Sequence, residues 1–158
     1  MDQATLLRAT SSGVRVTQVV IDAALRDTSK YANTNSFVVH LAEPIRDVVA
    51  IRLARTDYTD AQYGATPAYI SLNEYSNLQV ANGQSTNFFA RLTAGAETFP
   101  VSGDAFMTSP YTYVMRPIAR KLERFEVKVL TAAGALHPAT TAALALTLTI
   151  YCNDSRTL

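Results

Sequence analysis

Apolar side chains recur at every second position through most of this chain, the pattern of β-strands that bury one face. The alternation is clearest near the end, where Leu144, Leu146, Leu148 and Ile150 alternate with small or polar residues. Further alternating or β-branched runs occupy residues 14–21, 37–41, 49–53, 70–72, 88–92, 111–115 and 125–129. Helical periodicity is weak by comparison, so the pattern predicts an all-β chain of about eight strands.

Turn-forming residues separate these predicted strands. Asn- and Gly-rich turns lie at residues 33–35, 82–83, 102–104 and 133–134, and the six prolines fall between the alternating runs. About eight one-faced strands predict a single jelly roll, an antiparallel β-sandwich, with short helical turns in its loops, such as residues 22–27 or 118–123. We expect one such domain over residues 14–158, preceded by an N-terminal arm of residues 1–13.

Composition excludes several classes of protein. The chain has 158 residues, of which 48% are hydrophobic and 17% charged, with one cysteine and a net charge of +1. These values argue against a disordered chain, a disulfide scaffold and a strongly basic DNA-binding protein. Cys152 is interpreted as a small buried apolar residue. No secretory signal and no apolar run of transmembrane length are predicted.

Motifs for catalysis or metal binding do not occur in the sequence. It contains no nucleophile elbow, phosphate-binding loop, dinucleotide fingerprint or zinc helix. His40 lies in a predicted strand and is expected at the surface, while His137 precedes Pro138 in a predicted loop without a ligand at suitable spacing. Asp57 and Asp60 form a carboxylate pair, which we interpret as a solvated turn rather than an acid–base or metal site. We therefore expect no enzyme activity, no metal and no cofactor.

Two sets of side chains are candidates for binding other molecules. Tyrosines near predicted turns combine a large contact area with a polar tip, which suits a protein interface; they are Tyr58, Tyr63, Tyr69, Tyr75, Tyr111 and Tyr113. A basic cluster is suited to phosphates, anionic lipid or an acidic neighbour; it consists of Arg116, Arg120, Lys121 and Arg124. Simpler interpretations stay open for both: packing at a sheet rim, and a solvated strand edge partly neutralised by Glu123 and Glu126.

Polar residues between the first two predicted strands are suited to hold a loop. Asp22 and either Asn33 or Asn35 can accept hydrogen bonds from the amides of their own turns. Arg26 can tie the loop by its charge to the adjacent Asp27. None of these contacts requires catalysis, so the group indicates a scaffold.

The same region carries an ordered series of short motifs. In chain order they are residues 19–22, Arg26-Asp27, Tyr31, Asn33, Asn35, residues 37–41, Pro44-Ile45 and residues 47–53. This series resembles the opening of single jelly-roll capsid proteins, the minor capsid and penton-type proteins of large icosahedral double-stranded DNA (nucleocytoplasmic) viruses. Residues 117–122, 125–130 and Gly134 resemble the penultimate strand and turn of that family, and residues 143–151 resemble its closing strand.

The resemblance implies a non-enzymatic structural protein of the virion, made in the host cytoplasm without a signal peptide. Its partners would be major and other minor capsid proteins, with self-association and inner-membrane contact as further options, and without a specific nucleic acid or small-molecule substrate. The N-terminal arm and the loop from Asp57 to Pro67 would be contact elements. The alternative is a receptor- or glycan-binding jelly roll of a viral fibre or spike, with a sugar site at Asn73, Tyr75 and Asn77. A cupin-like metalloenzyme would need a His-rich site, for which two separate histidines are insufficient.

Overall fold

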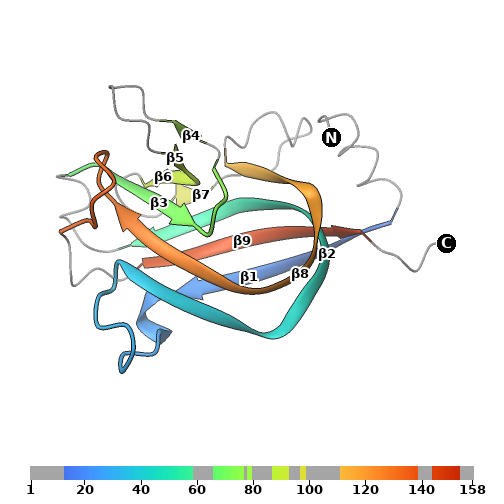
Figure 1. The fold of residues 1–158 in the computed structure, drawn as a ribbon, viewed down its shortest axis with the longest axis horizontal. Helices are drawn as coiled ribbons and strands as arrows, with labels where there is room; N and C mark the ends of the chain where they lie inside the picture. The colour runs from blue at the N-terminus through green and yellow to red at the C-terminus, as the bar shows by residue number, and fades with distance from the viewer. Residues whose placement is uncertain are drawn as a thin grey trace.

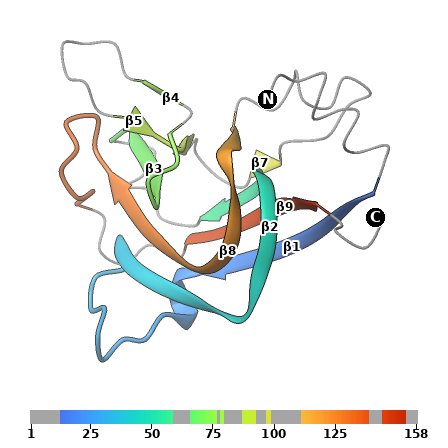
Figure 2. The same cartoon turned by 45° about the vertical axis from the view of Figure 1, so that its right-hand side comes forward.

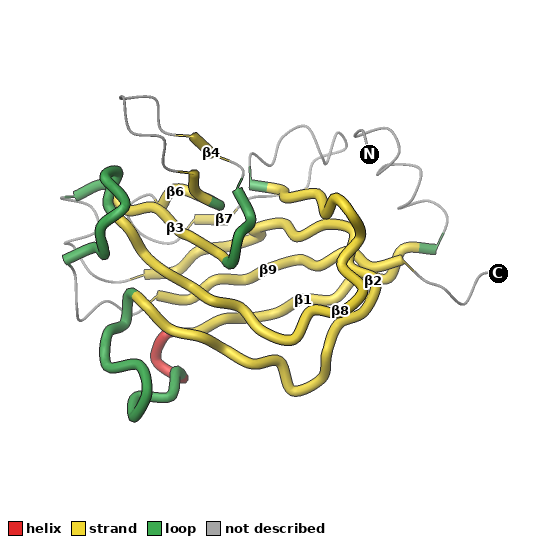
Figure 3. The backbone as a smooth tube through the Cα atoms, in the orientation of Figure 1, coloured by secondary structure: helices red, strands yellow, loops and turns green. Residues whose placement is uncertain are grey.

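The computed structural model describes residues 13–58, 66–76, 78–79, 87–92, 97–98, 111–138 and 144–153. Within these ranges the regular structure is β-strand apart from one 3-10 turn, η1 (Ala23–Leu25), which lies inside the predicted turn at residues 22–27 (Figures 1 and 3). The strands are β1 (Val14–Asp22), β2 (Ser36–Tyr58), β3 (Ala68–Leu72), β4 (Leu78–Gln79), β5 (Asn87–Phe88), β6 (Ala90–Leu92), β7 (Glu97–Thr98), β8 (Thr112–Leu130) and β9 (Leu144–Asn153). The predicted all-β class is confirmed.

Most strands belong to one curled antiparallel sheet. Its hydrogen-bonded order is β1-β9-β2-β8-β3-β6, with β7 paired to β2, while β4 and β5 form a separate pair. Figures 1 and 2 show β2 and β8 running side by side and bending strongly together. The bend folds the sheet over on itself, so that its two ends face each other across the core.

The two bent strands pair with different neighbours along their length. The first part of β2, Ser36 to His40, pairs with Lys128 to Arg124 in the second part of β8. The later part of β2, from Val48 onward, pairs with β9, and its residues Ala50 to Arg52 also pair with Val114 to Thr112 in the first part of β8. The sequence predicted separate strands on either side of each bend, whereas the backbone stays extended through it.

Two prolines lie inside these long strands, and the prediction that all prolines fall between strands was wrong. Pro44 lies within the register shift between His40 and Ile45, where no ladder partners exist for the intervening residues. Pro117 lies in the part of β8 that is skipped as the register shifts between Val48 and Ala50. A missing backbone donor does little harm where the ladder is already interrupted. Residues 118–123 are accordingly extended rather than helical.

The core fills the space inside the curl. Its largest fully buried side chains include Phe37, Phe88, Phe89 and Phe125, packed with the alternating leucines of β9. A second, smaller cluster lies apart from this core and consists of Val49, Ala50 and Tyr151, with Val14, Val114 and Ile118 packed against it. Residues 48–53 of β2 are consequently all buried, which strand alternation alone does not predict.

Candidate functional site

The loop between β1 and β2 is held by its own polar side chains. The carboxylate of Asp22 accepts a hydrogen bond from the Ala24 amide at 2.8 Å and caps η1. The Arg26 guanidinium donates to three backbone carbonyls, those of Ala23 (2.9 Å), Tyr31 (2.8 Å) and Ala32 (3.1 Å). Arg26 thus ties the two ends of the loop together through the backbone, instead of pairing with the neighbouring carboxylate.

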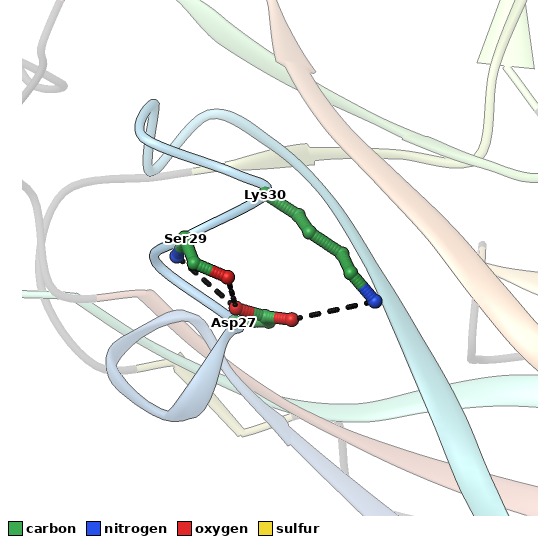
Figure 4. Close-up of polar contacts among 3 residues, drawn as sticks. All are labelled: Asp27, Ser29 and Lys30. Atoms are coloured by element: carbon green, nitrogen blue, oxygen red, sulfur yellow. Dashed lines mark hydrogen bonds and ion pairs between the residues drawn. The ribbon is translucent and has the colours of Figure 1, made fainter.

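Asp27 finds its partners further along the same loop (Figure 4). Its carboxylate accepts hydrogen bonds from the hydroxyl and the amide of Ser29, the latter at 3.1 Å, and lies 3.6 Å from the Lys30 ammonium. These contacts, the Ser29 hydroxyl first, lower the pKa of Asp27. All three side chains are exposed, so the cluster shapes a surface turn and encloses no site.

Asn33 and Asn35 perform different tasks. The Asn33 side-chain oxygen accepts the Asn35 amide at 2.8 Å, which closes a local turn. The Asn35 side chain is fully buried and donates to the carbonyl of His137 at 2.9 Å. The His137 ring is also buried, with Nε2 3.0 Å from the Thr66 carbonyl oxygen. Sequence reasoning missed His137, because no local signal marks a loop residue that is paired with a segment a hundred positions away.

Most of the candidate tyrosine side chains are buried or partly buried inside the protein. Tyr58, Tyr69 and Tyr75 are 7–8% exposed, and Tyr69 stacks on Phe88 with ring centroids 4.6 Å apart. Tyr75 lies 4.9 Å from Tyr113, centroid to centroid. Tyr111 and Tyr113 are partly buried, and Tyr63 lies outside the described residues. The described tyrosines therefore leave little ring surface for a partner.

The basic cluster is exposed along the bend of β8. Arg116, Arg120, Lys121 and Arg124 all face solvent. The structure extends the cluster across to β2, because Arg46 lies directly opposite Lys121 and His40 lies directly opposite Arg124. His40 is exposed, as the sequence predicted.

One carboxylate sits among these cations. Glu123 forms an ion pair with Lys121, and its pKa is lowered first by that hydrogen bond, with smaller effects from Arg124 and His40. Glu126 pairs instead with Lys128 at 2.7 Å. Of the two glutamates expected to neutralise the cluster, Glu123 therefore pairs with Lys121 inside it, whereas Glu126 pairs with Lys128 outside it.

The main polar group of the predicted sugar site, the Asn73 side chain, is engaged in hydrogen bonds within the fold. Asn73 accepts the Glu126 amide at 2.6 Å and donates to the Arg124 carbonyl at 3.3 Å, so its side chain extends the pairing of β3 with β8. A partly open hollow is lined by Asn73, Glu74, Arg124 and Glu126. Tyr75 is buried, and burial raises its pKa. Asn77 lies outside the described residues.

Groups with catalytic potential are dispersed. Asp57 binds Arg55 through two contacts of 2.7 Å, and its intended partner Asp60 lies outside the described residues. Cys152 is a buried free thiol, as predicted, and burial raises its pKa, partly offset by a hydrogen bond from Arg15. Among the described residues, no three His, Cys, Asp or Glu side chains gather as a metal site. The helical part of the described chain is too short to cross a membrane.

The described polar groups therefore hold loops and strand ends, and the accessible charge lies on the outer surface. Residues 1–12 of the predicted arm and residues 59–65 of the predicted contact loop lie outside the described residues. Comparison of the sequence with protein-family models and with curated proteins finds no match.

Proposed function

We propose that this chain is a single jelly-roll structural subunit of a virion, a minor capsid or penton-type protein of a large icosahedral double-stranded DNA virus. The observation that carries the proposal is the division of β2 and β8 between two layers. A jelly roll consists of two antiparallel sheets packed face to face, and its chain passes repeatedly from one sheet into the other.

The pairings support the two layers in detail. One layer would consist of β1, β9, the later part of β2 and the first part of β8, in that order, with the short β7 also paired to the later part of β2. The other would consist of the first part of β2, the later part of β8, β3 and β6. With β2 and β8 counted once in each layer and the two-residue β7 set apart, each layer has four strands, which makes the eight that the alternation predicts.

A scaffold role agrees with how the polar side chains are used. Arg26, Asn35 and Asn73 bind backbone groups of their own chain. Such contacts fix the shape of a surface without providing a nucleophile, an acid–base pair or a ligand set. We infer that the protein is not an enzyme, needs no cofactor and acts by contact with neighbouring capsid proteins.

The contact elements are assigned from sequence and charge. The N-terminal arm and the loop from Asp57 to Pro67 would reach neighbouring subunits. The exposed cluster at Arg116, Arg120, Lys121 and Arg124 would meet an acidic capsid partner or the inner membrane. Assembly would follow synthesis in the host cytoplasm.

A cryo-EM map of the purified particle tests the proposal. We expect density for this fold at fixed positions under the facets or at the vertices, together with a constant copy number by quantitative mass spectrometry of virions. Absence of the chain from purified virions would refute the role.

The basic cluster is tested separately by changing Arg116, Arg120, Lys121 and Arg124 together to Gln. Particles should then assemble less efficiently or lose lipid, whereas changing the exposed Lys30 and Arg91, which lie outside the cluster, to Gln should have no such effect. Unchanged particles in both variants would remove the cluster from the proposal without affecting the scaffold role.

The alternative function is a glycan- or receptor-binding module. The structure gives little support to the sugar site that the sequence predicted for it. The Asn73 amide is engaged with β8 and the Tyr75 ring is buried, so neither offers the exposed platform that a sugar needs. Glycan-array binding by the isolated protein would favour this alternative.

A further inference from the structure

The basic cluster of β8 faces a cation of β2 on the outer side of the bend that both strands share (Figure 2). Arg46 lies directly opposite Lys121, and both side chains are exposed. The adjacent pair, Ile45 opposite Leu122, is buried in the core that fills the curl. Because successive residues of a strand face opposite sides of the sheet, Arg46 and Lys121 point away from the core, onto the convex side of the bend.

Positive side chains are opposed here at a cost to the fold. Like charges directly opposite one another destabilise a sheet, and Arg46 and Lys121 are in that position. His40 and Arg124 form a second opposed pair of side chains that can carry positive charge. The ion pairs found among the described residues include Lys121 with Glu123 but neither Arg46 nor Arg124. An arrangement that the fold does not neutralise indicates an anion outside it.

The positive charge of the protein is concentrated at this bend. Residues 40–47 and 116–124 contain five Arg or Lys and three Asp or Glu, a net charge of +2 with His40 neutral. The whole chain has a net charge of +1, so the remaining residues sum to −1. An anionic surface would therefore attract this side of the protein and repel the rest, which orients the molecule.

We propose that this surface, here called the basic bend and made up of the basic cluster with His40 and Arg46, binds the headgroups of an anionic lipid bilayer. Each cationic side chain near such a bilayer adds to the attraction. Most of the cations are arginines, whose planar guanidinium groups suit phosphate oxygens. A convex ridge can present several of them at once to an extended surface.

The surroundings of the cations disfavour a small phosphate compound as the ligand. Such a compound needs a concave site that encloses it and supplies convergent polar groups. The hollow that Arg124 lines beside the bend also contains Glu74 and Glu126. Their negative charge would repel a phosphate.

The basic bend also differs from the centre of a protein interface. Such a centre is rich in aromatic and large apolar side chains. Among the described residues, the exposed large hydrophobic side chains are those of Val16, Val20, Leu25 and Leu136, and all lie outside residues 40–47 and 116–124. Attraction by charge without a fixed complementary shape suits a fluid lipid surface better than an acidic protein.

The inference deepens the role proposed for the basic cluster and rests on the proposed function for its setting in a virion. Binding to vesicles is nevertheless a property of the isolated chain. Vesicle binding by a chain that is absent from purified virions would refute the proposed function and leave this inference standing. A virion protein that does not bind vesicles would do the reverse.

Vesicle co-flotation of the full-length protein tests the proposal. We expect the protein to float with phosphatidylcholine vesicles that contain about 30% phosphatidylserine, and not with phosphatidylcholine alone. Raising the NaCl concentration from about 0.05 M to about 0.5 M should release the protein, because salt screens the attraction between charges. Failure to bind the anionic vesicles at low salt, or equal binding to neutral vesicles, would overturn the proposal.

Neutralising variants test whether the basic bend makes the contact. Arg46→Gln combined with Arg124→Gln should weaken vesicle binding about tenfold or more. Thermal unfolding should show no loss of stability, because opposed like charges are relieved. The matched double change Lys30→Gln with Arg91→Gln removes the same charge from exposed sites elsewhere and should weaken binding less than about threefold.

Two results with these variants would contradict the assignment. Equal weakening by the two double changes would attribute binding to net charge and not to the basic bend. Tighter binding of the wild-type protein to duplex DNA than to the anionic vesicles at the same salt concentration would assign the surface to nucleic acid. Either result would overturn the proposal.

Discussion

The side-chain amide of Asn35 donates a hydrogen bond of 2.9 Å to the backbone carbonyl of His137, although 102 residues separate them in the sequence. The surrounding backbone reinforces the contact, because the Asn35 carbonyl accepts from the Val129 amide and the His137 amide donates to the Val129 carbonyl, both at 2.9 Å. The start of β2 and the segment that follows β8 are thereby joined inside the protein.

Replacing Asn35 by Ala should lower the free energy of unfolding by about 1–3 kcal/mol, because the buried His137 carbonyl loses its side-chain donor and a cavity is left. Urea denaturation monitored by circular dichroism measures the change. Asn153→Ala provides the control, since Asn153 is exposed at the end of β9 and should cost less than about 0.5 kcal/mol. If both changes lowered the free energy of unfolding equally, the buried hydrogen bond of Asn35 would contribute no more to stability than an exposed side chain.

Replacing Arg26 by Lys should destabilise the protein by about 1–2 kcal/mol, even though the charge is kept. A single ammonium cannot reach the three carbonyls that the planar guanidinium binds. Thermal unfolding measures the loss, and amide hydrogen exchange should speed up in residues 23–35. The matched change Arg91→Lys, at an exposed site, should be neutral; a neutral Arg26→Lys would contradict the proposed clamp.

Removing Arg55 should raise the pKa of Asp57. The hydrogen bond from Arg55, with its charge, holds the pKa of this carboxyl below its ordinary value of 3.8. The stabilising effect is therefore present above about pH 4 and is lost as the pH falls through the lowered pKa of the folded state. NMR titration of the Asp57 carboxyl should show the pKa returning toward 3.8 in Arg55→Gln and staying low in Arg91→Gln. An unchanged value in Arg55→Gln would assign the lowering to another group.

Cys152 should react slowly with iodoacetamide while the protein is folded. The thiol is buried, and burial raises its pKa, so both access and the thiolate fraction are reduced. We expect labelling at pH 8 to be more than about 100-fold slower than in urea, where the thiol is exposed. Free cysteine in the same solution controls for the reagent, and rapid stoichiometric labelling of the native protein would contradict the burial.

Alternation predicted the simple strands well, because each of them rests one face on the core. β9 follows the pattern with Leu144, Leu146 and Leu148 facing inward, and β1 was predicted almost to its bounds. The same rule underestimated β2 and the later part of β9, where residues 48–53 and 148–152 are buried on both faces. A second covering layer cannot be seen from the periodicity of a single strand, because it depends on which other segments fold over it.

Pro44 and Pro117 illustrate a second limit of the sequence. Proline usually separates strands because it lacks a backbone donor, and on that ground both were predicted to lie between strands. Both occur instead where two long strands bend and their register shifts. Whether a proline ends a strand or is tolerated inside it depends on the partner strand, which local sequence does not specify.

The binding candidates show a third limit. A tyrosine has an apolar ring and a polar tip, so its position near a turn suits an interface and a sheet rim equally. Only packing against Phe88 distinguishes the two for Tyr69. The basic cluster was found by its density along the chain, but the contributions of Arg46 and His40 depend on strand pairing and were not predicted.

The continuity of β2 and β8 through their bends has a mechanical consequence. In a protein whose layers are joined only by loops, a protease can cut at the junction and leave each sheet whole. Here the junction is formed by β2 and β8 themselves, which continue through bends where the ladder between them is interrupted. A cut at either bend would divide a strand, and a load applied to one side is carried into the other by the same backbone.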